Sequence, residues 1–235
     1  MSEAFETRTL TDEIYRVGRE PDPWTWTDWV FAGAGGRFQG RWDDAHGRYR
    51  VLYASSQRFG AFIESLAQFR ADPHIVAEYA NIEDASHDAA LPPGVVPRSW
   101  RLERVITKGI PTDVTGSFVV VGAARTIATL RQAFASLVLQ YGIDDLDAAA
   151  IRLSVPRAFT QELSSYFEAQ IDENGQAYAG IHFLSKHGDD IENSAIFEQE
   201  RMRGQTPVLS VERENPDPDD DDLRRALDLL AIRME

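Results

Sequence analysis

The sequence predicts an α+β fold. Short apolar runs bounded by turn residues, which are typical of buried strands, recur along the chain. Longer segments whose apolar residues follow helical spacing lie between them. The 235 residues are 43% hydrophobic and 26% charged, an ordinary globular composition whose length suits one sizeable domain or two small ones. We expect one domain over residues 1–211, followed by an acidic linker and a short C-terminal helix over residues 212–235.

The N-terminal part of the chain predicts two strands and a helix joined by loops. Residues 14–17 have the pattern of a short strand, and turn residues follow them. Aromatic residues then alternate with polar ones over residues 24–31, which we interpret as a strand or loop that buries its rings rather than as a ligand cage. Residues 51–54 predict a buried strand, and the spacing over residues 57–70 predicts a helix with Glu64 near its start.

The remainder of the chain predicts further elements of both kinds. Residues 72–97 carry mixed, loop-like signals. The last two predicted strands are expected to pair across a turn at Gly188, Asp189 and Asp190. The patterns predict strands over residues 100–106, 179–185 and 194–197, and helices over residues 123–141, 160–171 and 223–232.

Composition excludes several classes of function. The absence of cysteine excludes disulfides, thiolate nucleophiles and cysteine-ligated metals, and five dispersed histidines leave little material for a metal centre. The net charge of −14 argues against direct binding of nucleic acid, which needs an excess of Lys and Arg. No apolar stretch approaches the roughly 20 residues that cross a bilayer, and the N-terminus has no signal-peptide pattern. We therefore expect a cytoplasmic protein with no metal and no membrane segment.

One segment of the chain suggests an anion site. Glycines surround Arg37 and Arg41, and glycine lets a backbone approach a ligand whose phosphate oxygens guanidinium groups can bind. The pattern is neither a dinucleotide-binding G-x-G-x-x-G, because Phe38 stands where the last glycine belongs, nor a Walker A loop. Arg16, Arg41, Tyr53 and Glu64 fall in one strand–loop–strand–helix unit, so two cations, a ring and a carboxylate are expected around one pocket. The residues alone do not name its ligand.

Five linked motifs stand out along the chain, namely Tyr15-Arg16-Val17, Gly36-Arg37-Phe38-Gln39-Gly40-Arg41-Trp42-Asp43, Val51-Leu52-Tyr53-Ala54, Phe62-Ile63-Glu64 and Gly180-Ile181-His182-Phe183-Leu184-Ser185. Taken together, these motifs resemble the RES-domain family. They cover about residues 14–70 and 178–198. The resemblance implies a fold related to ADP-ribosyltransferases, with a split, strongly bent sheet that grips NAD⁺. It also implies degradation of NAD⁺ by phosphorolysis or hydrolysis of the nicotinamide–ribose bond, often by the toxin of a toxin–antitoxin pair with a DNA-binding, Xre-type antitoxin.

The resemblance assigns roles to individual residues. The arginine, glutamate and serine that name the family fall on Arg16, Glu64 and Ser185. Arg16 and Arg41 would hold the pyrophosphate of NAD⁺, which is the substrate and not a resident cofactor, with phosphate as a possible co-substrate. Tyr53 would shape the nicotinamide–ribose end, and Tyr15 is a further expected binding residue. Glu64 would stabilise the oxocarbenium character of the ribose carbon, as in glycoside hydrolysis, or would orient the incoming oxygen. Ser185 would form a hydrogen bond with the ribose or the nicotinamide amide rather than attack as a nucleophile.

Each role has a structural alternative. Arg16 could close an ion pair at the surface, and Arg37 or Arg48 could replace Arg41 in the same loop. Glu64 could be a first-turn acid that the helix dipole favours. His182, Lys186 and His187 flank the serine and could help to bind phosphate, although a histidine beside a strand is more often structural. Asp43 stands where the family often carries asparagine, which adds negative charge near the expected anion site.

Two other functions remain open at this point. The chain could be a binding module that holds a nucleotide or a protein without turnover, or it could transfer ADP-ribose to a macromolecule. The acidic segment 212–222 could dock a basic antitoxin or cover the basic pocket. The sequence does not reveal the oligomeric state.

Overall fold

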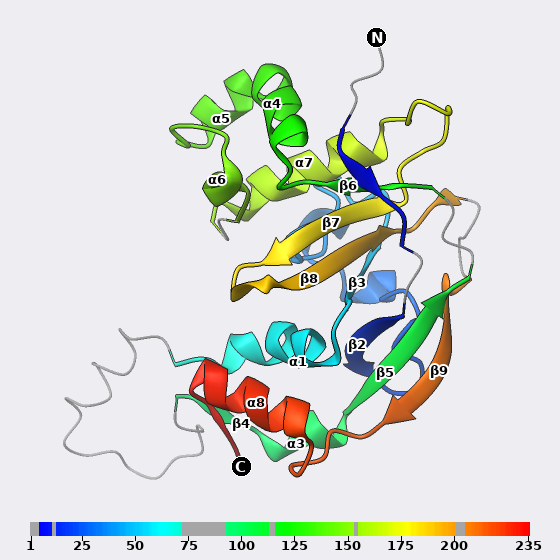
Figure 1. Cartoon of the computed structure of the whole chain (residues 1–235), viewed down its shortest axis with the longest axis vertical. Coiled ribbons are helices and arrows are strands. Elements are labelled where there is room, and N and C mark those ends of the chain that lie inside the picture. The colour runs from blue at the N-terminus through cyan, green and yellow to red at the C-terminus, as the bar shows by residue number, and fades with distance from the viewer. Residues whose placement is uncertain (1–4, 11–12, 72–92, 113–115, 153–154, 201–204) are drawn as a thin grey trace, which may run out of the picture.

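The computed structural model describes residues 5–10, 13–71, 93–112, 116–152, 155–200 and 205–235. Eight strands form one mixed sheet in the order β1-β6-β7-β8-β3-β2-β5-β9, in which the β6–β7 pair is parallel and the other pairs are antiparallel. Figure 1 shows a strong bend, since β7 and β8 run across the view while β5 and β9 run steeply. The strands are β1 Thr7–Arg8, β2 Ile14–Arg19, β3 Val51–Ser55, β5 Arg104–Pro111, β6 Phe118–Val120, β7 Gly180–Ser185, β8 Gly188–Phe197 and β9 Val208–Glu214. An α+β fold with a large mixed sheet is therefore confirmed.

Two groups of helices flank the sheet at opposite ends (Figure 1). One group, α4 to α7, packs beside β6 and β7, and the other, α1, α3 and α8, lies at the end near the C-terminus. The helices are α1 Arg58–Leu66, α3 Arg98–Leu102, α4 Ala124–Ala133, α5 Ala135–Gln140, α6 Ala148–Arg152, α7 Arg157–Glu168 and α8 Asp221–Leu230. Short 3₁₀ turns occupy Trp29–Phe31, Ala34–Gly36 and Ala67–Phe69, and the short strands β4 (Val95–Val96) and β10 (Arg233–Met234) pair in parallel. None of the helices in the described ranges is long and apolar enough to cross a membrane.

Three clusters of buried hydrophobic residues form the core of the described residues, and two of them hold the helices against the sheet. One cluster, which includes Trp42, Phe159 and Phe197, joins α4 to α7 to the β6–β7–β8 part of the sheet. A second, which includes Phe62 and Leu223, joins α1 to α8. The helix-forming pattern of α1 is thus explained, because its apolar residues face one cluster while Glu64 on the other side is exposed.

Several predicted elements are confirmed, with shifts at their ends. Strands stand at the predicted positions in β2, β3, β7 and β8, and helices in α1, α7 and α8. The predicted helix over residues 123–141 is instead two helices that break at Phe134. The strand predicted from Trp100 begins only at Arg104, because Trp100 lies in the short helix α3 and its ring is buried there. Strands β1, β4, β6, β9 and β10 are absent from the predictions. Most of the predicted loop 72–97 lies outside the described residues.

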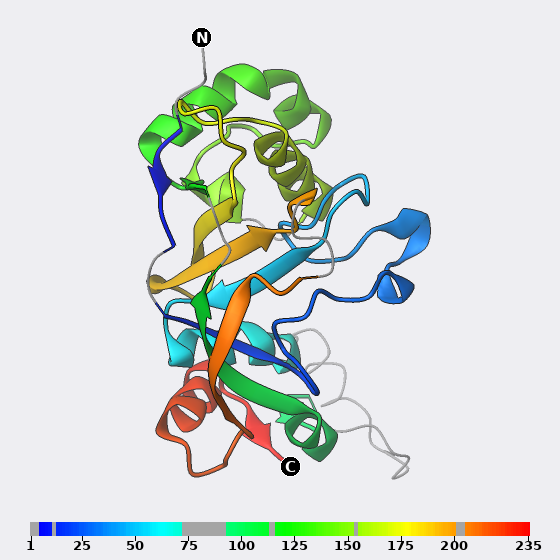
Figure 2. The ribbon, with the colours of Figure 1, turned by 90° about the vertical axis from the view of Figure 1, so that its right-hand side faces the viewer.

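The aromatic segment before β3 is buried in its first half and exposed in its second half. Trp24 and Trp26 are buried, as the interpretation of a ring-burying loop requires. The next two aromatic residues are not, since Trp29 is 38% and Phe31 is 71% exposed. Figure 2 shows this loop, in blue, projecting from the body of the molecule. The prediction that all four rings are buried is therefore wrong for the tip of the loop.

The acidic C-terminal segment is part of the fold. Glu212 to Glu214 extend β9, which pairs with β5, and α8 packs directly against α1. Arg58 at the start of α1 donates to Asp220 Oδ1 at 2.7 Å and pairs with Glu214 at 2.9 Å. Removing residues 212–235 would therefore remove the buried side chains of α8 that pack against α1, the helix that carries Glu64. A truncation cannot separate a docking role of this segment from its structural one.

Replacing Asp220 with alanine is expected to lower the free energy of unfolding by about 1–2 kcal/mol at pH 7. The Asp220 side chain caps α8 by accepting from the backbone N–H groups of Asp222 and Leu223, and it also pairs with Arg58. Burial alone would raise the pKa of Asp220, but the hydrogen bonds from Arg58 and the backbone outweigh it and hold the pKa below its ordinary value. The contribution of Asp220 to the free energy of unfolding is fully present at pH values above the pKa of this carboxyl in the unfolded chain. It is lost as the pH falls through the lower pKa of the folded state.

Urea unfolding of the wild type and of the Asp220→Ala variant at pH 7 and pH 3 measures this contribution. The difference between the two proteins should shrink at pH 3. Asp219→Ala removes an exposed acid from the same turn and is the matched control, with little expected effect. A difference between wild type and Asp220→Ala that grows as the pH falls would contradict the account.

Candidate functional site

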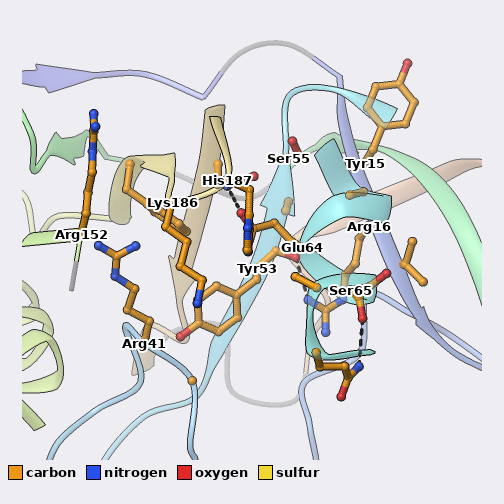
Figure 3. Close-up of a pocket in the computed structure, with 18 of the residues that line it drawn as sticks. Tyr15, Arg16, Arg41, Tyr53, Ser55, Glu64, Ser65, Arg152, Lys186 and His187 are labelled. Carbon is orange, nitrogen blue, oxygen red and sulfur yellow. Dashed lines mark hydrogen bonds between the residues drawn. The ribbon is translucent and has the colours of Figure 1, made fainter. Parts of the chain in front are cut away.

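A cavity of about 530 Å³ opens where α1 meets the sheet. Its walls come from β2, β3, the Gly40–Arg41 loop, α1, the ends of α6 and α7, and the β7–β8 turn (Figure 3). The lining residues are Tyr15, Arg16, Val17, Gly40, Arg41, Tyr53, Ala54, Ser55, Ala61, Glu64, Ser65, Ala67, Gln68, Arg152, Arg157, Phe183, Lys186, His187 and Asn193. The structure thus brings Tyr15, Arg16, Arg41, Tyr53 and Glu64 to one cavity, as the sequence predicts.

Arg16 is anchored by backbone oxygens. Its Nε donates to the carbonyl of Pro23 at 2.8 Å and its Nη1 to the carbonyl of Tyr53 at 2.7 Å. Burial lowers the pKa of Arg16 to about 10, so the group remains a cation at neutral pH. The alternative of a surface ion pair is wrong, because Arg16 makes no ion pair with a described carboxylate. A desolvated cation at the wall of a cavity is a prepared position for an anion.

Arg41 is the arginine of the glycine-rich loop that reaches the cavity. Its Nη2 donates to the carbonyl of Ile151, and its guanidinium carbon lies 5.0 Å from the ring centroid of Trp42 and 5.7 Å from that of Phe183. Burial lowers the pKa of Arg41 to about 10, an effect that Glu64 partly opposes. The buried Nε of Arg41 has no partner within the described chain. Neither alternative arginine lines the cavity, since Arg37 is exposed and Arg48 pairs with Asp44.

Tyr53 and Asp43 shape the loop beneath the cavity. The Tyr53 hydroxyl donates to Asp43 Oδ1 at 3.0 Å and accepts from the backbone N–H of Trp42 at 2.8 Å. Asp43 also accepts from the backbone N–H of Gly40. A Cβ on Gly40 would lie 2.5 Å from Asp43 Oδ2 and from the Tyr53 hydroxyl, so a larger residue would displace both side chains from their hydrogen bonds.

The Asp43 carboxyl faces its hydrogen-bond partners Tyr53 and Gly40 and not the cavity. Asp43 is buried and does not line the cavity. Burial raises its pKa, and burial also raises the pKa of Tyr53 well above its ordinary value, so Tyr53 is a neutral phenol. Asp43 therefore acts as a structural acceptor, and the negative charge expected near the anion site does not face it.

Glu64 stands in the last turn of α1 and not near its start, because the helix ends at Leu66. A carboxylate there faces the negative end of the helix dipole, which costs about 0.3–1 kcal/mol. The structural alternative of a favourable first-turn acid is therefore wrong. Glu64 Oε1 accepts from Asn193 Nδ2 at 2.9 Å, which ties the carboxylate to β8. An acid held at an unfavourable helix end and at the wall of a cavity is better explained by a role in that cavity.

Two further predicted site residues, Ser185 and Tyr15, lie less centrally in the site than Arg41 and Glu64. Ser185 is buried at the end of β7 and is absent from the cavity wall, and its Oγ accepts from the backbone N–H of His187 at 3.0 Å. Ser185 thus holds the turn that carries Lys186 and His187. Tyr15 lines the cavity and packs against the α1–α8 core, and Figure 3 shows its ring pointing away from Tyr53 and Arg41.

The β7–β8 turn is displaced from the predicted position. It consists of Lys186 and His187, because β8 already begins at Gly188. This shift places Lys186 and His187 in the cavity wall. Burial lowers the pKa of His187, although Glu64 opposes this effect, so the imidazole is neutral at pH 7.

Sequence reasoning missed Arg152, Arg157 and Asn193. Arg152 closes α6 and pairs with Asp189 at 2.8 Å, while Arg157 opens α7 and donates to the carbonyl of Gln39 at 2.6 Å. Neither arginine belongs to a motif. Both follow Arg41 by more than 110 residues in the sequence, and no local pattern indicates that they line the same cavity. The Asn193 position in β8, opposite Ser55 of β3, was a usable signal, since polar side chains are rare in buried strands.

The cavity concentrates positive charge in an acidic protein. Its described lining has Arg16, Arg41, Arg152, Arg157 and Lys186 against the single carboxylate of Glu64. Of these five cations, only Arg152 has an ion pair with a described carboxylate. In the view of Figure 3, Arg41, Arg152 and Lys186 lie on one side of Tyr53 and Arg16 on the other. The described residues contain no cluster of three or more metal-ligating side chains.

Comparison with known proteins gives one structural likeness. No protein-family model matches the chain, and no curated protein matches it. The chain is similar to one in the crystal structure of the M. tuberculosis MbcT–MbcA toxin–antitoxin complex, with 13% sequence identity and a TM-score of 0.46. The likeness covers 96% of this chain and 92% of that chain. A likeness of this size says nothing about what this chain binds or does.

Proposed function

We propose that the chain degrades NAD⁺ by cleaving the bond between nicotinamide and ribose. The observation that carries the proposal is a cavity of about 530 Å³ whose described lining residues place one carboxylate among five cations. NAD⁺ combines a doubly negative diphosphate with a cationic leaving group on a ribose. A site for it needs guanidinium groups for the first and a carboxylate near the second. The motifs that resemble the RES-domain family support the same assignment.

The five cations contribute to different extents to binding of the diphosphate. Arg41, Arg157 and Lys186, which lack carboxylate partners among the described residues, are free to bind the diphosphate, with Arg152 beside them. Each charged hydrogen bond is worth about 1.5–3 kcal/mol. Arg16 has two of its nitrogens on backbone carbonyls, so it contributes its remaining Nη2. Against the five cations stand the two negative charges of the diphosphate and the carboxylates of Glu64 and Asp189, which leaves a surplus of one positive charge. This surplus favours inorganic phosphate over water as the acceptor.

The reaction places its developing charge next to Glu64. As the bond from the ribose carbon to nicotinamide breaks, its electron pair moves to the ring nitrogen and nicotinamide leaves as a neutral molecule. The ribose carbon gains positive character, which the Glu64 carboxylate stabilises. An oxygen of phosphate or water then bonds to that carbon, and water as acceptor releases its proton to solvent. Ser185 contributes by holding the turn of Lys186 and His187 in the cavity wall.

The products identify the reaction. Purified chain is incubated with NAD⁺ in buffers with and without inorganic phosphate, and the ribosyl product is identified by mass spectrometry. We expect nicotinamide release that depends on phosphate and yields ADP-ribose 1″-phosphate. Equal release in both buffers, with ADP-ribose as product, would replace phosphorolysis by hydrolysis. Adenine-derived label on protein or DNA would replace both by transfer of ADP-ribose to a macromolecule.

The same resemblance extends the proposal to a toxin with a protein partner. We propose that the activity is restrained by an Xre-type antitoxin. Co-expression with the product of an adjacent gene, followed by co-purification and assay of nicotinamide release, tests this extension. A stable complex with reduced release supports it, and a complex with undiminished release contradicts it.

A further inference from the structure

Asn193 carries an unexplained acceptor at the wall of the cavity. Its side chain is only 3% exposed, yet the residue lines the cavity. Nδ2 is used, since it donates to Glu64 Oε1 at 2.9 Å. Oδ1 is buried and has no hydrogen-bond partner within the described chain. Leaving a buried polar group unpaired is costly, so such a group needs an explanation.

The orientation of this amide follows from its neighbour. Glu64 is a carboxylate and can only accept, so the amide must turn its NH₂ group toward Glu64. The oxygen then points elsewhere and remains an acceptor. Because Oδ1 and Nδ2 belong to the same amide, the free acceptor lies within a few ångströms of the Glu64 carboxylate. A ligand group that satisfies it must be a donor placed directly beside the group on which Glu64 acts.

We propose that Asn193 determines specificity in this site by accepting, through Oδ1, a hydrogen bond from a hydroxyl of the ribose whose bond is cleaved. This inference rests on the proposed function, because it is the proposed reaction that sets the ribose beside Glu64. The ribose hydroxyls are the donors nearest to the reacting carbon, since the 2″-hydroxyl is carried on the adjacent carbon, whereas the carboxamide nitrogen is five bonds away. One residue thus holds the carboxylate through Nδ2 and the sugar through Oδ1. A site built in this way rejects a sugar that lacks the hydroxyl, because Oδ1 is then left unpaired.

Binding of an uncleavable ligand tests the inference independently of turnover. Isothermal titration calorimetry measures the Kd of ADP-ribose and of its 2″-deoxy and 3″-deoxy analogues. For the wild-type protein, one of the two analogues should bind about 10- to 100-fold more weakly than ADP-ribose. This comparison between ligands needs no variant, so a failure to fold cannot imitate it. Two deoxy analogues that both bind as tightly as ADP-ribose would overturn the inference.

A variant then assigns the lost interaction to Asn193. In Asn193→Ala, ADP-ribose and the sensitive analogue should bind with Kd values within about twofold of each other, because the acceptor is gone. Ser194→Ala is the matched control, since Ser194 is a buried polar neighbour whose side chain faces the opposite side of β8. It should keep the wild-type discrimination. Discrimination that survives in a folded Asn193→Ala protein would overturn the inference.

The outcomes separate this inference from the proposed function. Discrimination that depends on Asn193, with no nicotinamide release from NAD⁺, would uphold the ribose contact and reject the reaction. Nicotinamide release with no discrimination between the analogues would uphold the reaction and reject the role of Asn193.

Discussion

Glu64→Gln is expected to reduce kcat for nicotinamide release by about 100- to 1,000-fold while ADP-ribose still binds. The amide has nearly the same shape as the carboxylate but carries no charge to stabilise the positive ribose carbon. Its hydrogen bond with Asn193 can be rebuilt through the amide oxygen, so the local structure should persist. The measurement is the rate of nicotinamide release at saturating NAD⁺, together with the Kd of ADP-ribose by calorimetry.

A distant glutamate provides the control for this prediction. Glu103 is an exposed residue between α3 and β5, and its contacts to Arg19 and Arg104 are long, at 4.0 Å and 3.8 Å. Glu103→Gln removes the same charge from the protein and should leave kcat unchanged. If Glu64→Gln weakened ADP-ribose binding as much as it lowered kcat, Glu64 would be a binding residue and its catalytic assignment would be wrong.

Arg41→Ala is expected to weaken the binding of ADP-ribose by about 10- to 100-fold. The desolvated guanidinium, held by the Ile151 carbonyl and the Trp42 and Phe183 rings, lies at the cavity wall with its buried Nε unpartnered. The larger part of the loss should appear in Kd and KM, since the diphosphate is bound equally in the ground state and in the transition state. Calorimetry gives the Kd, and the initial rate at varied NAD⁺ gives kcat and KM.

Arg37 offers a matched control in the same loop. It is exposed and lies outside the cavity wall, so Arg37→Ala removes an equal charge four residues away. Its Kd for ADP-ribose should stay within about twofold of the wild type. Equal losses in the two variants would mean that the loop attracts the ligand by overall charge, and the specific role of Arg41 would be wrong. Thermal melting of both variants verifies that each is folded.

The sequence predicts the part of the site that is local in the chain. Arg16, Arg41, Tyr53 and Glu64 fall within residues 14–70, where apolar alternation and helical spacing are clear enough to place two strands and α1. The antiparallel register of β2 against β3 then brings these residues together. The end of α1 was harder to place, because Ala67 to Phe69 continue the apolar pattern as a 3₁₀ turn, which obscures that Glu64 stands in the last turn.

The rest of the site depends on contacts between distant segments. Arg152 and Arg157 reach the cavity because the apolar faces of α6 and α7 pack into the core beside β7, an arrangement that no local pattern contains. The predicted position of the β7–β8 turn was wrong because the prediction followed the strong turn preferences of Gly188, Asp189 and Asp190. In the structure these three residues begin β8. Pairing with β7 overrides that preference. The turn therefore falls on Lys186 and His187, and Ser185 faces inward to support it.

Nicotinamide release by the purified 235-residue chain tests the proposed cleavage of NAD⁺ in this cavity most directly. NAD⁺ in large excess over protein is followed by liquid chromatography, with Glu64→Gln in parallel. The account predicts many equivalents of nicotinamide per wild-type chain and a rate at least about 100-fold lower for the variant. Wild-type protein that is folded, binds ADP-ribose and releases no nicotinamide in either the presence or the absence of phosphate would contradict it.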